Sequence, residues 1–432
     1  MQWPETLDGW LSLLEVRHDQ TIQLGLERVR RVREALGHPQ TCPVFIVGGT
    51  NGKGSTCALL EAVLLAAGYR VGLYTSPHLL RYNERVRIDG REASDAELVD
   101  AFVEVERARG DVPLTYFEHG TLAAWAAFAR AGVEAVILEV GLGGRLDAVN
   151  VFEPDCAIVT SVALDHMDYL GSTREAIGFE KAGIFRAGKP AICADPLPPQ
   201  SLLDHAAAIG APLWVSGRDF GFAGDQNQWA FWLAQGSRRG GLAYPALRGT
   251  NQLLNAAAVM AACEAVKPIL PVPMQAIRQG FMLVELPGRF QVLPGRPAVV
   301  LDVAHNPQAA GVLNENLASM GFFPETWAVF GMLADKDVAG VVSLLKDRVD
   351  HWRVATLPGP RGLSADGLIA LLHDEGVKGD VAGFETPAAA YRAVREQAAE
   401  GDRIVVFGSF LTVADVLAGM KVSHQVQQDG GL

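Results

Sequence analysis

Residues 43–56 read Pro-Val-Phe-Ile-Val-Gly-Gly-Thr-Asn-Gly-Lys-Gly-Ser-Thr, an apolar run that stops at a glycine-rich turn with one lysine. Residues 58–65, Ala-Leu-Leu-Glu-Ala-Val-Leu-Leu, then favour a helix. Glycines let backbone N–H groups turn towards an anion, and the helix N-terminus adds partial positive charge. Lys53 would reach the terminal phosphates, and Ser55 or Thr56 would contact magnesium. The stretch therefore predicts a strand, loop and helix that bind a nucleoside triphosphate.

The loop departs from the common pattern G-x-x-x-x-G-K-S/T at two positions. Val47 stands where that pattern has its first glycine, and Gly54 stands where it has the hydroxyl. A glycine-rich turn without a ligand is the alternative. The strand before the loop, the helix after it and the lysine within it favour phosphate binding.

Composition limits the partners. The 432 residues are too many for one ordinary domain, and two or three are expected. A formal net charge of −12 argues against nucleic acid or an anionic membrane as partner. It leaves ATP open, because a local loop can bind an anion on an acidic protein.

The chain has the features of a cytoplasmic protein. No apolar run approaches the roughly 18 residues of a membrane span, and residues 1–5 lack the basic start of a secretory signal. The five cysteines lie far apart and form no C-x-x-C pair. Free thiols in a reducing compartment fit this spacing best.

Apolar runs alternate with helical stretches after the loop. Residues 132–140, 156–161 and 190–194 favour strands, and residues 120–130 and 172–185 favour helices. Near-continuous apolar strands separated by helices predict a parallel sheet covered on both faces. Aromatic residues and glycines over residues 219–247 suggest a small antiparallel patch instead.

A domain boundary is expected near residue 290. Three prolines and two glycines over residues 287–297 are a linker signature. Strand and helix then alternate again over residues 298–432. We predict an α/β protein: a P-loop domain with a doubly wound, mostly parallel sheet over residues 1–286, and a smaller Rossmann-like α/β domain over residues 298–432.

Two side chains at strand ends are candidates for a cation. Ser76 follows a short strand expected over residues 70–74, at the edge where doubly wound sheets bind ligands. A turn or cap serine is the alternative, and the local sequence favours it. Glu139 closes the apolar run 132–140, where a carboxylate is costly unless it is paired or binds a metal. A strand-end glutamate facing water is the alternative.

His166 and Lys181 are weaker candidates. His166 could complete a magnesium shell with Glu139, but magnesium prefers oxygen, and a structural histidine is slightly favoured. Lys181 lies among apolar and small residues in 179–185, and burial would lower its pKa. A neutral amine can react with carbon dioxide, and the carbamate could bind a second magnesium ion. A surface lysine paired with Glu180 is the alternative that composition prefers.

Further polar groups could bind substrates. Arg145 and Asp147 follow a glycine-rich turn that can fold close to a ligand. Asn255 opens an alanine-rich helix, where a carboxamide can read an adenine edge or cap the helix. Arg289 could clamp a phosphate. The segments 302–307 and 408–412 each end a strand of the second domain.

Taken together, these segments resemble the folylpolyglutamate synthases, and most closely the bacterial bifunctional dihydrofolate synthase/folylpolyglutamate synthases, within the Mur ligase-like ATP-dependent amide ligases. The resemblance covers almost the entire chain. It rests on residues 21–29, 49–55, 76–87, 114–120, 139–150, 164–166, 180–185, 287–290, 302–307, 331–337 and 408–412. It favours functional roles for Ser76, His166 and Lys181, which the local sequence left open.

The resemblance implies a role for each group of residues. Those implied to bind ATP are Thr50, Asn51, Gly52, Lys53, Gly54, Ser55, Asn255, Arg289, Asp302 and His305. Those implied to hold two magnesium ions are Ser55, Ser76, Glu139, His166 and Lys181 as a carbamate, with Lys53, Glu139, His166 and Lys181 catalytic. Those implied to bind dihydropteroate or folate are Thr115, Tyr116, Phe117, Glu118, Leu146, Asp147, Ala148 and, more weakly, the segment 16–19 with His18. Lys336, Asp337 and Ser409 are candidates for the incoming glutamate.

The implied activity is an ATP-dependent ligation. A carboxylate of dihydropteroate or of a reduced folate would become an acyl phosphate, and the amine of L-glutamate would displace phosphate. The first domain, like the central domain of Mur ligases, would hold ATP and folate. The second would hold glutamate and close over ATP about the linker. We expect a monomer.

Three alternatives remain. A monofunctional folylpolyglutamate synthase would use only reduced folates. A muramyl peptide ligase would carry an additional N-terminal domain, for which residues before the loop leave little room. A P-loop switch ATPase would have one compact domain and would not need the amino acid.

Overall fold

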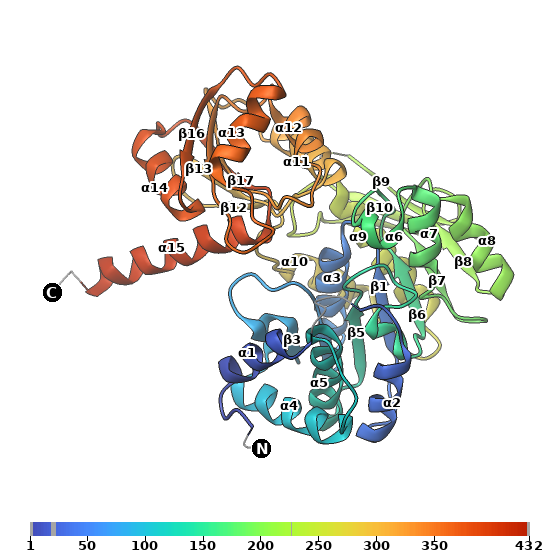
Figure 1. The fold of residues 1–432 in the computed structure, drawn as a ribbon. Helices are drawn as coiled ribbons and strands as arrows, with labels where there is room; N and C mark the ends of the chain where they lie inside the picture. The colour runs from blue at the N-terminus through green and yellow to red at the C-terminus, as the bar shows by residue number, and fades with distance from the viewer. Residues whose placement is uncertain (1–2, 19–22, 226, 430–432) are drawn as a thin grey trace. The chain divides into compact units, whose positions relative to one another are not determined.

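The structure is a computed structural model that describes residues 3–18, 23–225 and 227–429. The chain divides into two compact units. The first comprises Met1–Ala246 and Gln252–Val284, and the second comprises Leu247–Asn251 and Glu285–Leu432. In Figure 1 most of the first unit is blue to green, and most of the second is orange to red.

A sheet of eight strands forms the centre of the first unit. Its strands are β1 (Val44–Gly48), β2 (Val71–Tyr74), β3 (Val86–Ile88), β4 (Arg91–Glu92), β5 (Ala135–Glu139), β6 (Cys156–Val159), β7 (Ala191–Cys193) and β8 (Leu213–Val215). Their order is β4-β3-β2-β5-β1-β6-β7-β8. In this order, each pair of neighbouring strands from β2 to β8 is parallel. Strand β3 pairs antiparallel with both β2 and β4. The predicted mostly parallel sheet is confirmed.

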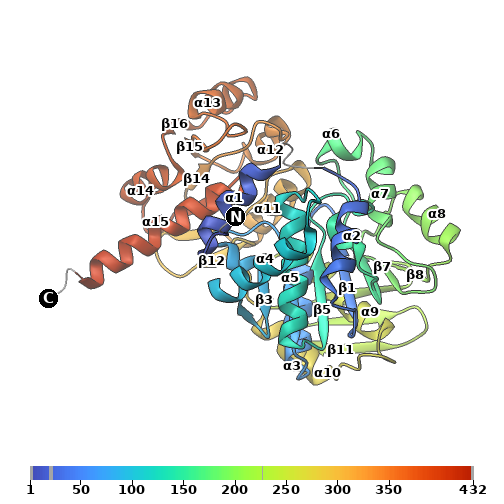
Figure 2. The same cartoon turned by 60° about the horizontal axis from the view of Figure 1, so that its bottom comes forward.

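Helices cover both faces of this sheet (Figures 1 and 2). They are α1 (Leu7–Arg17), α2 (Glu27–Leu36), α3 (Lys53–Ala66), η1 (Tyr82–Arg85), α4 (Asp95–Arg109), α5 (Tyr116–Ala131), η2 (Ala148–Val151), α6 (Met167–Leu170), α7 (Arg174–Ala182), α8 (Gln200–Ile209), α9 (Asn251–Ala265) and α10 (Met274–Leu283). The connections β1–α3–β2 and β2–α5–β5 run in opposite directions across the sheet, so right-handed crossovers put α3 and α5 on opposite faces. Gly280 of α10 lets that helix approach α3 closely, because a Cβ there would lie 2.6 Å from Val63 Cα.

A second, antiparallel sheet of three strands follows in the first unit. It contains β9 (Phe220–Gly224), β10 (Trp229–Leu233) and β11 (Arg238–Leu242). The indole of Trp229 stacks on Phe281 of α10, with 6.2 Å between ring centroids. This is the antiparallel patch that the aromatic residues predicted.

The second unit has a smaller sheet in the order β12-β13-β17-β14-β15-β16. Its elements are β12 (Gln291–Leu293), β13 (Ala298–Leu301), α11 (Pro307–Ser319), β14 (Thr326–Phe330), α12 (Val338–Leu345), β15 (His351–Ala355), α13 (Ala365–Asp374), β16 (Asp380–Phe384), α14 (Pro387–Gln397), β17 (Arg403–Phe407) and α15 (Phe410–Asp429). Only β12 pairs antiparallel within this sheet. The smaller Rossmann-like sheet is confirmed.

The structure differs from prediction at the segment 287–297. Strand β12 lies within it and pairs with β13, and the side chain of Phe290 is buried in the core of the second unit. The prolines and glycines mark turns on either side of β12. This part of the predicted linker therefore belongs to the second sheet.

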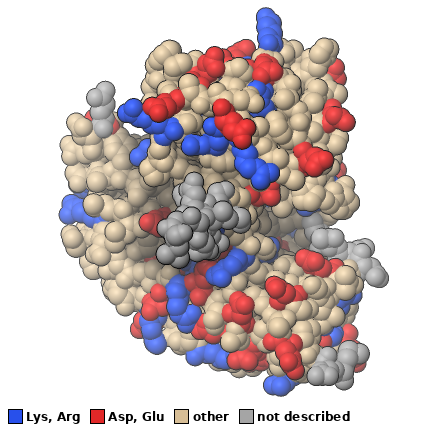
Figure 3. All heavy atoms as spheres, turned by 90° about the vertical axis from the view of Figure 1, so that its left-hand side faces the viewer, with Lys and Arg blue, Asp and Glu red and all other residues tan. Residues whose placement is uncertain are grey.

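The hydropathy of the helices and the charged side chains at the surface fit what the composition predicts. Within the described residues, we find no helix with the length and apolar character needed to cross a membrane. On the face in Figure 3, Lys and Arg side chains are interspersed with Asp and Glu.

Candidate active site

The glycine-rich loop connects the end of β1 to the start of α3. Gly49 and Gly52 have φ angles of 142° and 89°, which glycine tolerates best. A Cβ on Gly49 would also overlap the Thr160 hydroxyl. Lys53 Nζ donates to the carbonyls of Gly49 at 3.1 Å and Thr50 at 3.2 Å. The loop thus curls around the ammonium group of Lys53.

The segment after β6 holds this loop in place. Thr50 N donates to Ser161 O at 2.8 Å, and Thr50 Oγ1 accepts from Ala163 N at 3.0 Å. The hydroxyl of Thr160 donates to Asn51 O at 2.7 Å. Sequence reasoning missed this supporting role, although Thr160 and Ser161 close the strand predicted over residues 156–161.

Carboxamides from α9 contact the start of α3. Asn255 Nδ2 donates to Gln252 Oε1 at 3.0 Å, and Gln252 Nε2 donates to Ser55 Oγ at 3.4 Å. Both carboxamides are buried. Asn255 also lies against the loop, because a Cβ on Gly52 would fall 2.8 Å from its Oδ1. The structure therefore brings predicted Asn255 to the loop and places Gln252, from the same carboxamide motif, between Asn255 and Ser55.

Ser76 and Glu139 meet at the same edge of the sheet. They follow or close the adjacent parallel strands β2 and β5. Ser76 N donates to Glu139 Oε2 at 3.0 Å, and the Glu139 side chain is buried. The alternative of a strand-end glutamate facing water is therefore wrong. An oxygen-rich pair at this position suits magnesium.

Lys181 is buried within α7 rather than paired on the surface. Only 3% of it is exposed, and Glu180 instead pairs with Arg145 at 2.8 Å. Burial and the nearby charge of Lys53 lower the pKa of Lys181 to about 7, against the opposing effect of Asp165 and Asp147. An amine that is partly neutral near pH 7 can form a carbamate.

His166 lies at the start of α6 in a left-handed conformation, with φ 51°. Its Nε2 is 4.0 Å from Asp165 Oδ2, and about a third of its side chain is exposed. Across the described residues there is no group of three or more His, Cys, Asp and Glu side chains that could hold a metal ion. The predicted ligand set includes serine hydroxyls and a modified lysine, and it stays a prediction.

Two of the predicted pterin contacts, Phe117 and Asp147, lie against the turn that follows Glu139. The Phe117 ring packs on Gly141, because a Cβ on Gly141 would come within 2.7 Å of that ring. The centroids of the Phe117 and Tyr74 rings are 5.8 Å apart. The Asp147 carboxylate accepts from Leu142 N at 2.8 Å, and burial raises its pKa to about 6.

The other residues of the predicted pterin set lie in several different segments and make separate contacts. Glu118 accepts from Thr115 N at 2.8 Å and from Arg28 Nη2 at 2.7 Å, so its carboxylate also fixes the start of α5. The guanidinium of Arg85 lies 5.5 Å from the ring centroid of Tyr116. Leu146 and Ala148 flank Asp147, and His18 follows α1. Asp19, Thr21 and Ile22 lie outside the described residues.

A separate set of candidates lies in the second unit. Strands β13, β17 and β14 are parallel neighbours, so Asp302 with His305, Ser409, and Lys336 with Asp337 follow strand ends at one edge. The Asp302 carboxylate accepts from Phe290 N at 2.9 Å and Ala304 N at 2.8 Å. Asp337 and Ser409 accept from Gly340 N and Leu411 N, respectively.

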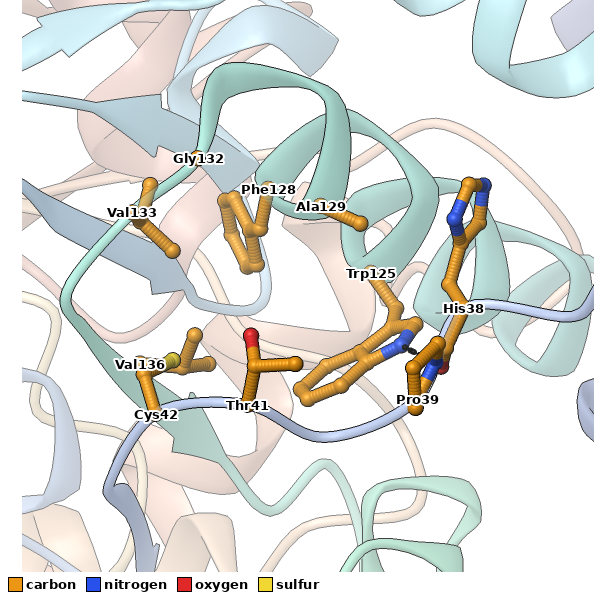
Figure 4. Close-up of a pocket in the computed structure, with 10 residues that line it drawn as sticks. All are labelled: His38, Pro39, Thr41, Cys42, Trp125, Phe128, Ala129, Gly132, Val133 and Val136. Carbon is orange, nitrogen blue, oxygen red and sulfur yellow. Dashed lines mark hydrogen bonds between the residues drawn. The ribbon is translucent and has the colours of Figure 1, made fainter.

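A cavity of about 170 Å³ lies at the opposite, amino edge of the first sheet (Figure 4). It is lined by His38, Pro39, Thr41, Cys42, Trp125, Phe128, Ala129, Gly132, Val133 and Val136. Burial raises the pKa of the Cys42 thiol, which disfavours the reactive thiolate. Because the cavity lies at the amino edge, it is distinct from the candidate active site at the carboxyl edge.

Comparison with known proteins gives the class. Residues 47–196 match the Mur ligase middle domain, and residues 288–410 match the Mur ligase, glutamate ligase domain. With the phosphate loop and two α/β units, these matches define a Mur-type ligase.

Individual relatives extend over nearly the whole chain. The dihydrofolate synthase/folylpolyglutamate synthase of Escherichia coli is 47% identical over 412 residues, covering 95% of this chain and 94% of that protein. Its Haemophilus influenzae counterpart is 40% identical over 433 residues, covering 95% and 97%. The chain therefore belongs to the dihydrofolate synthase/folylpolyglutamate synthase family.

Solved structures of related proteins support the same family. The structure of E. coli FolC in complex with DHPP and ADP superposes with a TM-score of 0.93 at 46% identity, covering 98% of this chain and 100% of that chain. A bifunctional folylpolyglutamate synthase/dihydrofolate synthase with Mn, AMPPNP and L-glutamate bound gives 0.89 at 47% identity, covering 97% and 100%. These relatives favour this family over a muramyl peptide ligase or a switch ATPase.

Proposed function

We propose that this chain is an ATP-dependent ligase that adds L-glutamate to dihydropteroate, giving dihydrofolate, and to reduced folates, giving folylpolyglutamates. It releases ADP and phosphate. The observation that carries the proposal is the packing of Phe117 on Gly141, two residues beyond Glu139. This packing supports an acceptor pocket beside the group that would hold the metal.

The residues of the first unit would activate the acceptor carboxylate. A free carboxylate does not react with an amine, because its leaving group would be oxide. Transfer of the γ-phosphoryl group makes an acyl phosphate, and Lys53 in the glycine loop would stabilise the charge that develops. Thr50 to Ser55 would bind the phosphates, and Asn255 would contact the nucleotide.

Magnesium, held by Ser55, Ser76, Glu139 and His166, would neutralise phosphate charge. The buried Glu139 carboxylate, which accepts a hydrogen bond from Ser76 N, supports this, because hard oxygen ligands are what magnesium prefers. Lys181 as a carbamate would add a carboxylate ligand for a second ion. Its buried amine and lowered pKa support that modification.

The second unit would supply the amine and part of the nucleotide site. Arg289, Asp302 and His305 would contact ATP, and Lys336, Asp337 and Ser409 would bind glutamate. Arg289 precedes β12, whose first residue pairs with the last residue of β13, and the other residues follow β13, β14 and β17. Their position at one edge of the sheet supports a shared site. We also propose that the protein is a monomer in the cytoplasm. The location is supported by the cysteines, because all five are free and four are buried.

Mass spectrometry of the products tests the function. Purified protein is incubated with ATP, magnesium and L-glutamate, with either dihydropteroate or a reduced folate as acceptor. We expect both acceptors to gain glutamyl units. A gain on reduced folate alone would mean a monofunctional folylpolyglutamate synthase, and no gain on either acceptor would refute the proposal.

A further inference from the structure

We propose that Phe410 is a positioning residue for the nucleotide, because its ring holds the guanidinium of Arg289 at the carboxyl edge of the second sheet. The inference rests on the proposed contact of Arg289 with ATP. It adds a residue without any polar side-chain group, which a search for charged or polar ligands would pass over.

The aromatic ring lies directly beneath the cation. Arg289 Cζ is 4.7 Å from the centroid of the Phe410 ring, within the range of a cation–π interaction. The His305 ring lies 6.3 Å from the same centroid. One half-buried ring thus touches two of the three side chains of this unit that are proposed to contact ATP.

The turn before Phe410 fixes its place. Gly408 directly follows β17 and has a φ of 108°, and Phe410 begins α15. A Cβ on Gly408 would lie 2.5 Å from Gly331 O and 2.9 Å from the Phe330 ring. The chain therefore passes close to β14 here, and the ring starts from a rigid point.

The backbone beside Arg289 is fixed as well. Phe290 has a φ of 44°, which is uncommon for a residue with a side chain. Its N–H donates to Asp302 Oδ2 at 2.9 Å, and Val303 N donates to Gly288 O at 3.0 Å. The main chain on both sides of Arg289 is thus held by the segment after β13. The guanidinium donates to Gly288 O at 3.4 Å, and the Phe410 ring contacts its face.

Phe410 holds the guanidinium without competing for the anion. An aromatic ring engages the face of a guanidinium, whereas a phosphate engages the N–H groups at its edge. A side chain already held in position loses less conformational freedom when the ligand binds. Replacing the ring by an aliphatic group should therefore weaken nucleotide binding and leave the affinity for glutamate unchanged.

The test compares Phe410→Leu with Phe410→Tyr. ADP affinity is measured by titration calorimetry, and the KM values for ATP and glutamate by steady-state kinetics. We expect Phe410→Leu to weaken ADP binding and raise the KM for ATP by about three- to tenfold, as loss of one cation–π contact implies. Phe410→Tyr should restore wild-type values, since it keeps the ring.

Phe323→Leu is the matched control. Arg403 Cζ lies 4.9 Å from the Phe323 ring in the same unit, and neither residue is part of the proposed site. This variant should bind ADP as the wild type does. Equal ADP affinity of Phe410→Leu and the wild type would overturn the inference, as would a KM increase confined to glutamate.

A double variant separates positioning from general damage. If Phe410 acts through Arg289, then adding Phe410→Leu to Arg289→Met should weaken ADP binding no further than Arg289→Met alone. Independent, additive losses would refute the inference. Direct ADP binding decides this even if the wild type makes no glutamylated product, so failure of the proposed function stays distinguishable.

Discussion

The two edges of the first sheet contrast sharply in chemistry. The carboxyl edge carries buried charges, with Glu139 and Lys181 each less than 5% exposed. The amino edge has a cavity whose lining residues carry no carboxylate, lysine or arginine, and it has surface ion pairs, such as that between Lys189 and Asp155. Burying a charge opposes stability unless the charge is paired or binds a ligand. The carboxyl edge therefore departs from what stability alone would select, and this departure indicates function.

The largest expected effect is the loss of ligation in Lys53→Ala. This change removes the cation that the glycine loop surrounds, so we expect product formation to fall on the order of 10³-fold or more. Thermal unfolding should change little. The control is Lys189→Ala, which removes a lysine from the amino edge and should keep full activity. Wild-type turnover in Lys53→Ala would contradict the assignment.

Lys181 gives a prediction about stability and pH. Its pKa is lowered from 10.5 to about 7 on folding. Between these values the unfolded chain holds a proton that the folded chain lacks, so stability rises with pH across this window. The full cost of the buried ammonium is present below about pH 7 and is relieved as the pH increases.

Lys181→Met should therefore be inactive yet more heat-stable than the wild type at pH 6. The advantage should shrink towards pH 9. Thermal unfolding at a series of pH values checks this, with Lys189→Met as control for loss of a lysine at the other edge. A pH-independent difference between Lys181→Met and the wild type would argue against a strained buried amine.

Gly141→Ala tests the acceptor wall. The added Cβ would come within 2.7 Å of the Phe117 ring and displace it. Overpacking of this kind costs about 1–3 kcal/mol, so we expect the KM for dihydropteroate to rise roughly tenfold while the KM for ATP is unchanged. Gly311→Ala in α11 has open space around its Cβ and is the control. An unchanged KM for dihydropteroate would show that Phe117 does not contact the acceptor.

The smallest expected effect is a change in folding stability caused by a substitution at the amino edge. Val136→Ile adds one methylene group beside the cavity and should stabilise the fold by about 0.8 kcal/mol without changing turnover. Val44→Ile is the matched control, because Val44 is its paired neighbour on β1 and is fully buried away from the cavity lining. That change should destabilise. Denaturant unfolding measures both, and altered turnover in Val136→Ile would undermine the contrast between the edges.

The sequence predicted the local features of the site well. The glycine loop between β1 and α3 could be predicted because glycines allow the tight turn and the lysine in it can reach a phosphate. The position of Glu139 at a strand end was also clear, since an apolar run stopped there. Burial of Lys181 was less clear, because composition preferred a surface ion pair with Glu180 and only the resemblance to the family favoured a functional role.

Contacts between distant segments could not be predicted in this way. Gln252 reaches Ser55 across 197 positions of sequence, and Phe410 reaches Arg289 only because β13 and β17 are neighbours in the sheet. Helix α4 was also missed, although the Ser94–Glu97 capping box was a local signal for its start. The roles of the individual site residues stay predictions.

The most direct measurement is ADP release with and without L-glutamate, in the presence of ATP, magnesium and dihydropteroate. The proposed ligase should release ADP steadily only when glutamate is present, with one dihydrofolate formed for each ADP. Steady ADP release at the same rate without glutamate, or without any glutamylated product, would contradict the claim that the carboxyl edge activates a carboxylate for amide formation.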